Sequence, residues 1–252
     1  NTLDVLGIVG NGAGYNTLLE AGIEEADLLI AVTNSDELNL LCCLIAKKAG
    51  NCQTIARVRS PHYNSELEFI KQALGLSMII NPELETAKDI IRLIRLPSAS
   101  KIDVFAKGKV ELLKILIPEG SVLDNMQIMD IPPRLHCNVL VCAVERGDKV
   151  YIPSGSFTLQ SGDKISFVAT PKNALDFFNK IGFSKSTVKN VMIVGGGNIA
   201  VYLTERFIEM GIKVKIIEQD RLRCEQLSEL FPSALIINAN ASDNNVLLEE
   251  GL

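Results

Sequence analysis

The segment Val191-Met-Ile-Val-Gly-Gly-Gly-Asn-Ile-Ala200 joins a β-branched run to a glycine-rich loop and to the start of an apolar helical pattern. This order matches the G-x-G-x-x-G/A fingerprint, in which a strand leads through a phosphate-binding loop into a helix. Gly195 would make the tight turn, Gly196 would continue the loop, and Gly197 would let the backbone approach a pyrophosphate, while Ala200 would allow close helix–strand packing. The segment therefore predicts a Rossmann-like α/β fold with a nucleotide site at the loop.

The residues after the loop extend this prediction. A helix beginning at Asn198 and Ile199 would direct free N–H groups and its positive dipole end at the phosphates. The next strand ends at Glu218, 23 residues after the first glycine. A carboxylate there can accept hydrogen bonds from the ribose of NAD or of an adenosine nucleotide, and it disfavours NADP by repelling the 2′-phosphate. Alternatively, Glu218, Gln219 and Asp220 only cap the following helix, which we expect of Asp220.

Strands and helices alternate on both sides of a different middle segment. A βαβ series runs from Val5 to Asn81 and resumes at Asn190, which predicts parallel sheets covered on both faces. The predicted strands are Leu6–Val9, Leu28–Val32, Thr54–Val58, Met78–Ile80, Val191–Val194, Val214–Ile217 and Leu235–Ile237. The predicted helices are Tyr15–Ala21, Asp36–Ala49, Ser65–Leu74, Pro82–Leu96, Ile199–Met210 and Arg221–Phe231, with Asn34, Ser65 and Asn81 as N-caps and Gly50 as a C-terminal stop.

The middle segment has the pattern of a small, mostly antiparallel α+β domain. Its predicted strands are Val110–Ile117, Val139–Val144, Lys149–Ile152 and Lys164–Val168, separated by glycine-containing turns. We expect an incomplete Rossmann-like domain over residues 1–100, the small domain over 101–172, a linker over 173–189, and the first half of a second Rossmann-like domain over 190–252.

An internal repeat connects the two ends of the chain. Residues 5–23 align with residues 234–252 without a gap, at an offset of 229 and with eight identities in 19 positions. The repeat therefore predicts that the chain contains one full repeat unit of a duplicated protein and the beginning of the next. The second copy has 45 residues, Asn190–Ala234, before the shared segment. We accordingly expect about 40 residues, with the first copy's own glycine loop, to be missing before Asn1.

Composition disfavours several classes of protein. The formal net charge of −5 leaves no basic surface for nucleic acid. The apolar runs hold five or six residues, far fewer than the roughly 20 needed to span a bilayer. The cysteines have no CxxC spacing, which favours buried thiols in a reducing cytosol over metal binding; they are Cys42, Cys43, Cys52, Cys137, Cys142 and Cys224. His62 and His136, the only histidines, lie in no nucleophile or ligand spacing.

Several longer motifs carry a specific family resemblance. They are GGGNIA at 195–200, IIEQD at 216–220, AVTNSDELN at 31–39, TIARVRSPHY at 54–63, FAKGKVELLKILIPEGS at 105–121 and IPSGSFTLQSGDKISFV at 152–168. Nearly the whole chain resembles the peripheral regulatory proteins of Trk-type potassium uptake, which contain RCK (KTN) nucleotide-binding domains and C-terminal companion domains. The resemblance implies a homo-oligomeric ring of modules at the inner, cytoplasmic face of the cell membrane. That ring would gate a TrkH-like potassium translocator in response to NAD(H) or ATP/ADP.

The resemblance also implies further site residues. Thr33 and Asn34 would approach the nucleotide, and Arg57 would approach its phosphates, although an exposed strand edge is the plainer interpretation of Arg57. Asn11 and Asn240 occupy the turn after the third strand, where the family usually has Gly-Asp-(Ala/Gly)-Thr. Asn in place of Asp removes a charge near the adenosine. In some relatives the small domain binds cyclic di-AMP, which makes it a possible second ligand here.

Two alternatives and one structural hypothesis remain open. An NAD-dependent oxidoreductase would share the fingerprint, but residues 101–170 offer no His, Lys-Tyr or Cys-His proton-donor arrangement. The same module could instead serve a cation channel or antiporter. Finally, residues 190–217 could complete the first half-domain as one composite sheet, with Gly195 facing Thr33 and Arg57, because each half-sheet would otherwise expose a central edge.

Overall fold

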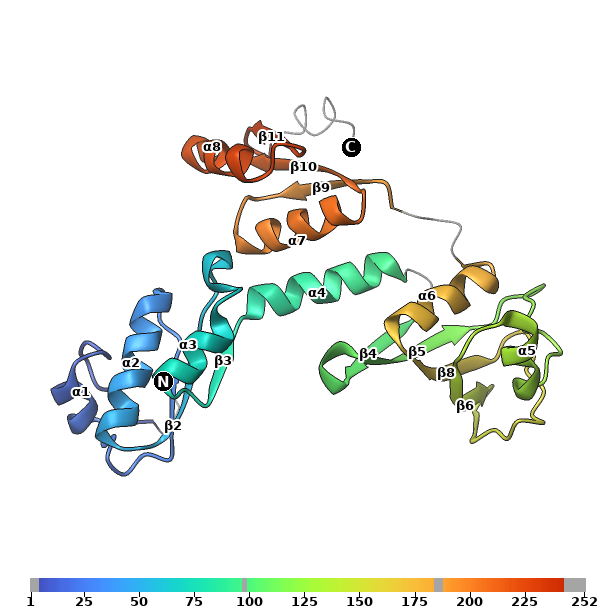
Figure 1. Ribbon diagram of the computed structural model, residues 1–252, viewed down its shortest axis with the longest axis horizontal. Helices are drawn as coiled ribbons and strands as arrows, with labels where there is room; N and C mark the ends of the chain where they lie inside the picture. The colour runs from blue at the N-terminus through green and yellow to red at the C-terminus, as the bar shows by residue number, and fades with distance from the viewer. Residues whose placement is uncertain (1–4, 97–98, 184–187, 243–252) are drawn as a thin grey trace. The chain divides into compact units, whose positions relative to one another are not determined.

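The computed structural model describes residues 5–96, 99–183 and 188–242, traced by colour in Figure 1. The chain divides into two compact units. One unit contains residues 1–88 together with 190–252, and the other contains residues 89–189. The fold class is α/β, with parallel Rossmann-like sheets in the first unit and a separate small α+β domain, as the sequence predicts.

The first half-domain is a three-stranded parallel sheet in the order β1-β2-β3. Its elements are α1 (Tyr15–Glu20), β1 (Leu28–Ala31), α2 (Asp36–Ala49), β2 (Gln53–Arg57), η1 (Pro61–Tyr63), α3 (Leu67–Leu74), β3 (Met78–Ile80) and α4 (Pro82–Arg95). α2 packs on β1 and β2 through Cys43, Ala46 and Ala56, which have no exposed surface. Small side chains at this interface let the helix lie close to the sheet.

Two predictions for this half-domain are wrong. Residues 5–9 form no strand, and the side chains of Val5, Leu6 and Val9 are exposed. β1 is covered on one face only, since Leu28 and Ile30 on its other face are 47% and 54% exposed. Residues 5–9 form no strand because a strand needs a hydrogen-bonded neighbour, and no described strand pairs with them or with the outer edge of β1. The exposed face of β1 has a different cause, because side chains on the face of a sheet are covered by packed helices and not by a neighbouring strand.

The second half-domain has the order β11-β10-β9, also parallel. It consists of β9 (Asn190–Val194), α7 (Asn198–Glu209), β10 (Lys213–Glu218), α8 (Arg221–Leu230) and β11 (Leu235–Asn238). Ile216 and Phe207 are almost completely buried where α7 packs on β10. The repeat beyond residue 242 lies outside the described residues.

The composite-sheet hypothesis is wrong. β9 pairs with β10 and β1 pairs with β2, in two separate sheets that share no strand among the described residues. Gly195 therefore does not occupy the first sheet beside Thr33 and Arg57. β9 already has a partner of its own copy, and that short local connection is easier to close than a pairing across more than 100 residues.

The other unit is built on a five-stranded antiparallel sheet in the order β4-β5-β8-β6-β7. Its elements are β4 (Lys101–Phe105), η2 (Ala106–Gly108), β5 (Val110–Leu116), η3 (Ile128–Asp130), α5 (Ile131–Leu135), β6 (Leu140–Arg146), β7 (Lys149–Tyr151), β8 (Lys164–Ala169) and α6 (Pro171–Lys180). Arg146 donates to both oxygens of Asp163, at 2.7 Å each. The ion pair joins β6 to the turn before β8, and Asp163 is fully buried.

Residues 173–189 are not simply a linker, because α6 occupies their first half. Ala174, Phe177 and Phe178 of α6 are buried in the small unit's core, where the rings of Phe177 and Phe167 meet edge to face. The Pro171 start and the i, i+3, i+4 spacing of these three apolar residues are the signal of an amphipathic helix. This helix extends the small domain past its predicted end at residue 172.

The helix caps follow local chemistry, with two corrections. Asn81 caps α4 through a hydrogen bond from the Leu84 N–H (2.9 Å), and Gly50 ends α2, as predicted. The cap of α2 is Ser35 rather than Asn34, since the Ser35 hydroxyl accepts from Leu38 N–H at 3.1 Å. α3 begins at Leu67 without a side-chain cap, so Ser65 has no such role.

Candidate functional site

The glycine loop has the backbone geometry that the fingerprint predicts. Gly195 adopts φ +96°, a conformation that residues with a Cβ rarely adopt, and its N–H donates to Ile217 O at 2.8 Å. α7 begins directly after the loop, with Gly197 as its N-cap residue. A Cβ added at Gly197 would meet no atom within 4 Å, so the backbone there faces open space. Ala200, one turn into α7, is buried as predicted.

Gly196 has a role that the sequence pattern did not reveal. A Cβ at this position would lie 2.6 Å from Leu227 Cδ1 and 3.1 Å from Glu218 Oε2, which is too close for either contact. The Gly196 N–H donates to Glu218 Oε2 at 2.6 Å, so the loop lies directly against the end of β10. A larger residue in the middle position would therefore displace the Leu227 and Glu218 side chains, so close packing favours glycine at a position that the fingerprint treats as variable.

Glu218 lines a pocket formed at the carboxyl ends of the second sheet. This strand-end pocket has a volume of about 260 Å³ and includes Gly195, Glu218, Gln219 and Asn240 in its lining. Besides the bond from Gly196, Glu218 Oε1 accepts from Asp220 N–H at 2.8 Å. Each carboxylate oxygen keeps a further lone pair, so the group can still accept bonds from a ligand's hydroxyls. Asp220 itself caps α8 by accepting from Leu222 N–H at 2.9 Å, as predicted.

The hydrogen bonds to Glu218 predict how the stability of the fold depends on pH. The backbone N–H groups of Asp220 and Gly196 lower the pKa of Glu218 below its ordinary value. A lowered folded-state pKa stabilises the fold above the unfolded-state pKa of about 4.3, and this contribution disappears as the pH falls through the folded-state value. The difference in melting temperature between the wild type and Glu218→Gln should therefore be constant from about pH 7 to 5 and shrink below about pH 4.3. A difference that stays constant in acid would contradict the assignment.

Asn11 and Asn240 make the same local turn in the two copies. Asn11 Oδ1 accepts from Ala13 N–H at 3.0 Å, and Asn240 Oδ1 accepts from Ser242 N–H at 2.9 Å. This is an Asx-turn, which Asn and Asp both make readily. An Asp in either position could make the same turn, so the two asparagines keep the turn's geometry without the charge.

In the first half-domain, a buried asparagine organises the ends of β1 and β2. Asn39 on α2 has no exposed surface, and its Oδ1 accepts from the Thr33 N–H and hydroxyl, both at 2.7 Å. Its Nδ2 donates to Arg57 O at 2.9 Å. Arg57 Nη2 in turn donates to Thr33 O at 2.8 Å, while its Nε is buried without a partner. Thr33 and Arg57, predicted separately, are thus brought together by a residue that the sequence did not single out.

Asp36 makes a parallel connection at the start of α2. Its Oδ2 accepts from the N–H groups of Arg59 and Ser60, both at 2.8 Å. The Arg59 guanidinium lies 3.5 Å from Asp36 Oδ1 and also donates to Asn34 O. Asn34 is therefore held by its backbone, and its side chain is free to face a ligand.

Tyr202 links the two half-domains. It lies on α7 one turn after the glycine loop, is 4% exposed, and accepts from Asn81 Nδ2 at 2.9 Å. Its hydroxyl donates to Arg59 O at 3.1 Å, and burial raises its pKa, which keeps the donating proton in place. Asn81 is also the cap of α4. The helix that begins at the glycine loop is therefore bonded to the first copy at two points.

Removing this hydroxyl should destabilise the first unit. Tyr202→Phe leaves the buried Asn81 amide and the Arg59 carbonyl without a partner, and we expect a loss of about 1–3 kcal/mol in the free energy of unfolding by urea. Tyr15→Phe, at a tyrosine that is 52% exposed, is the matched control and should change stability by less than about 0.5 kcal/mol. Equal effects of the two substitutions would show that the Tyr202 bonds contribute nothing.

The candidate residues thus fall into three groups. Gly195, Glu218, Gln219 and Asn240 share the strand-end pocket. Thr33, Asn34 and Arg57 gather at the ends of β1 and β2. The others do not line the strand-end pocket: Gly196, Gly197 and Ile199 continue from Gly195 into the loop and helix start, with Gly196 bonded to Glu218, while Asn198 faces a different pocket and Asn11 makes its own turn.

Thiol and membrane features add little to the site. Of the six cysteines, five are buried and all are free thiols, as predicted. Burial raises the pKa of the Cys43 thiol to about 11, so it is protonated at neutral pH. In the described part of the chain, no cluster of three or more His, Cys, Asp or Glu residues could hold a metal ion. No helix among the same residues has the length and apolar character to cross a membrane.

Comparison with protein families decides the classification. The TrkA-N domain profile matches residues 2–82 and 191–252, which are the two half-domains. The chain belongs to the TrkA-N family. The TrkA-C domain profile matches residues 112–182, between the two TrkA-N segments, and includes α6. The order of TrkA-N, TrkA-C and a second TrkA-N segment confirms the family predicted from the motifs.

Proteins with the same domains are named for potassium uptake. The Trk system potassium uptake protein TrkA homolog of Archaeoglobus fulgidus is 35% identical over 248 residues, covering 98% of this chain and 56% of the relative. The Trk system potassium uptake protein TrkA of Haemophilus influenzae is 31% identical over 253 residues, covering 98% of this chain and 55% of the relative. This chain thus spans about half the length of these relatives.

Solved structures confirm the RCK-type fold of this chain. The GsuK RCK domain has a TM-score of 0.60 at 15% identity, covering 97% of this chain and 51% of that one. The GsuK channel bound to NAD has the same TM-score and identity, covering 97% of this chain and 42% of that one. At this identity the likeness is one of fold, and it agrees with the RCK-type architecture predicted from the sequence.

Proposed function

We propose that this chain is a nucleotide-binding regulatory module of a Trk-type potassium uptake system, and that it carries out no chemical reaction. The glycine loop is the observation that carries the proposal. Gly195 makes the strained turn, the backbone at Gly197 faces open space, and Glu218 lies in the pocket beside them. A phosphate at the start of α7 and a ribose over Glu218 would use these groups as Rossmann-like folds do.

The ligand is NAD(H) or ATP/ADP. The NAD-bound state of a fold relative supports NAD(H). The proposed contacts are Gly195, Gly196, Gly197, Asn198, Ile199, Glu218, Gln219 and Asn240 in the second copy, with Asn11, Thr33, Asn34 and Arg57 in the first. Arg57 suits a phosphate because its buried Nε lacks a partner. Cyclic di-AMP at the small domain is a further ligand to include in any binding panel.

The names of the relatives support the role in transport. In this proposal the module lies in the cytoplasm against the inner face of the membrane, forms a homo-oligomeric ring, and gates a TrkH-like potassium-translocating subunit. The relatives at 31–35% identity are Trk proteins, whereas the GsuK channel is 15% identical. A Trk transporter is therefore favoured over a channel or an antiporter, and regulation over oxidoreductase chemistry.

A nucleotide panel tests the ligand. We expect NAD, NADH, ATP or ADP to raise the melting temperature of the 252-residue chain, because a ligand at 100 times its dissociation constant stabilises by about 2.7 kcal/mol. NADP should give a much smaller shift than NAD, since Glu218 would repel its 2′-phosphate. Equal shifts with NAD and NADP would place the ribose away from Glu218, and no shift with any nucleotide would refute the proposed function.

The partner is tested separately. The tagged chain, incubated with detergent-solubilised membranes, should retain a potassium-translocating subunit identified by mass spectrometry, and retention should change when nucleotide is added. Recovery of an antiporter or a channel instead would show that the module regulates that class of membrane protein.

A further inference from the structure

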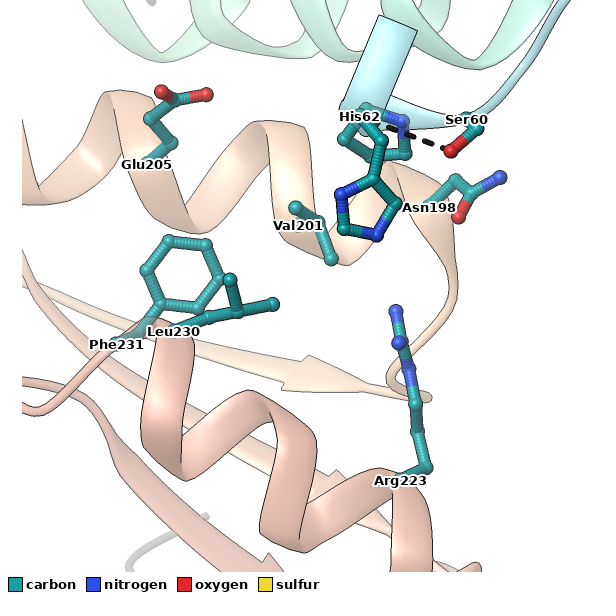
Figure 2. A pocket seen from close by; sticks show the side chains of 9 residues that line it. Ser60, His62, Asn198, Val201, Glu205, Arg223, Leu230 and Phe231 are labelled. Atoms are coloured by element: carbon teal, nitrogen blue, oxygen red, sulfur yellow. Dashed lines mark hydrogen bonds between the residues drawn. The ribbon is translucent and has the colours of Figure 1, made fainter.

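A second pocket shares no lining residue with the strand-end pocket. We call it the helix-groove pocket. It has a volume of about 310 Å³ and lies between α7 and α8, with η1 of the first copy completing its wall (Figure 2). A volume of this size is at the lower end of the range for small-molecule sites. Both copies contribute residues to it.

One end of the helix-groove pocket is cationic and polar. Figure 2 shows His62, Asn198 and Arg223 gathered there. Arg223 uses its Nε to donate to Gly196 O at 2.7 Å and its Nη1 to donate to Gln226 Oε1 at 3.0 Å. Its Nη2, the His62 ring and the Asn198 amide have no hydrogen-bond partner among the described residues. These polar groups line the same end of the pocket without a protein partner, and the Arg223 guanidinium supplies the positive charge that suits an anionic group there.

The other end is mainly apolar, but it also includes Glu205, which Figure 2 shows above Phe231 and away from Arg223. Val201, Leu230 and Phe231 line it, and Figure 2 shows the Phe231 ring and the Leu230 side chain on the same side, opposite the polar end. Leu230 is 50% exposed, so part of this apolar surface is in contact with solvent. A flat hydrophobic body would cover it and gain the free energy of removing that surface from water.

We propose that the helix-groove pocket is a second ligand site, which takes a small organic anion with a flat apolar body. The anionic group binds Arg223, Asn198 and His62, and the body lies against Leu230 and Phe231. The site is separate from the strand-end pocket, because the two share no lining residue. Arg223 holds the Gly196 carbonyl, and the Gly196 N–H bonds to Glu218, so an occupant would contact the residue that positions the glycine loop.

Naphthyl phosphate is a suitable probe because it combines a flat apolar body with an anion. We expect it to bind the 252-residue chain in isothermal titration calorimetry, with naphthol and inorganic phosphate each binding at least about tenfold more weakly, because each lacks one half of the interaction. Binding of inorganic phosphate as strong as that of naphthyl phosphate would mean that the apolar end has no role, and would overturn the proposal.

Matched variants locate the probe. Arg223→Gln should weaken its binding by about tenfold or more, whereas Arg221→Gln, on the same helix and with an 83% exposed side chain, should leave it unchanged. Leu230→Glu places a carboxylate at the half-exposed apolar end and should weaken binding without disturbing the fold. Gln219→Glu places a carboxylate in the strand-end pocket at a residue with no hydrogen bond to Gly196 or Arg223 in the described part of the chain, and it should change the probe's dissociation constant by less than about twofold.

The outcomes are separable from those of the proposed function. If Gln219→Glu weakens the probe as much as Arg223→Gln does, the probe lies at the strand ends and the second site is refuted. If Arg221→Gln and Arg223→Gln weaken probe binding equally, the probe is held by non-specific attraction to positive charge, and the site is refuted. Probe binding that depends on Arg223 supports the site even where no nucleotide binds, so a failure of the nucleotide panel leaves this result intact.

Discussion

Gly197→Asp should weaken nucleotide binding by at least about 100-fold, a change of about 2.7 kcal/mol. The added carboxylate would extend from the N-cap position of α7 into the space that a pyrophosphate would occupy. Two negative charges about 4 Å apart repel by about 4 kcal/mol at an effective dielectric constant of 20, which exceeds the expected loss. The measurement is the dissociation constant for whichever of NAD, NADH, ATP and ADP binds the wild type.

The fold should survive this substitution. Gly197 has φ −70° and ψ −172°, an extended conformation open to any residue, and a Cβ there meets no atom within 4 Å. Asp is also a favourable N-cap residue, so the melting temperature without ligand should stay constant or rise slightly. Gly197→Asn is the matched control, because it has nearly the same size without the charge, and it should weaken binding much less. Unchanged affinity in Gly197→Asp would show that the nucleotide does not bind at the glycine loop.

Asn39→Ala should lower the free energy of unfolding of the first unit by about 3 kcal/mol. Asn39 is fully buried and bonds to Thr33 through its Oδ1 and to Arg57 O through its Nδ2. Truncation leaves these groups in a water-poor environment with no replacement partner, and an unsatisfied buried polar group costs about 1–3 kcal/mol. The measurement is urea unfolding, with hydrogen exchange at the Thr33 amide as the local readout.

Asn16→Ala is the control for this prediction. Asn16 is an exposed residue of α1, and its replacement should change stability by less than about 0.5 kcal/mol. In Asn39→Ala the Thr33 amide should exchange faster than amides in the centre of β2, because the loop after β1 loses its attachment to α2. If the Thr33 amide remains as protected as in the wild type, Asn39 does not hold the candidate residues together.

The sequence by itself determined the features that depend on a few neighbouring residues. The turn at Gly195 needs a positive φ, the Asp220 side chain reaches the N–H groups one turn ahead, and Asn11 and Asn240 each bond two residues on. Hydrophobic periodicity gave the bounds of α2 without error, Asp36 to Ala49. These features form wherever the local residues occur, because all of their partners lie within one turn of helix or one loop.

Tertiary structure decided the features whose partners lie far away in the chain. Asn39 and Tyr202 were not predicted, since the bonds that make them important reach 18 residues to Arg57 and 121 residues to Asn81. Most residues of α6 were predicted to form a linker because the contacts that stabilise this helix are made in the core, where Phe177 and Phe178 are buried. A sequence pattern indicates which side of a helix is apolar, but not which distant surface that side covers.

The repeat gives the sharpest comparison. Residues 6–9 and 235–238 are equivalent in the alignment, yet only the second segment is a strand. β11 pairs with β10 in parallel, from Leu235 against Lys215 to Asn238 against Glu218, whereas Leu6 and Val9 are exposed and have no strand beside them in the described part of the chain. A β-strand is stabilised by backbone bonds to its neighbour, so its own residues determine only the tendency to form it. The presence of that neighbour is decided by the tertiary structure.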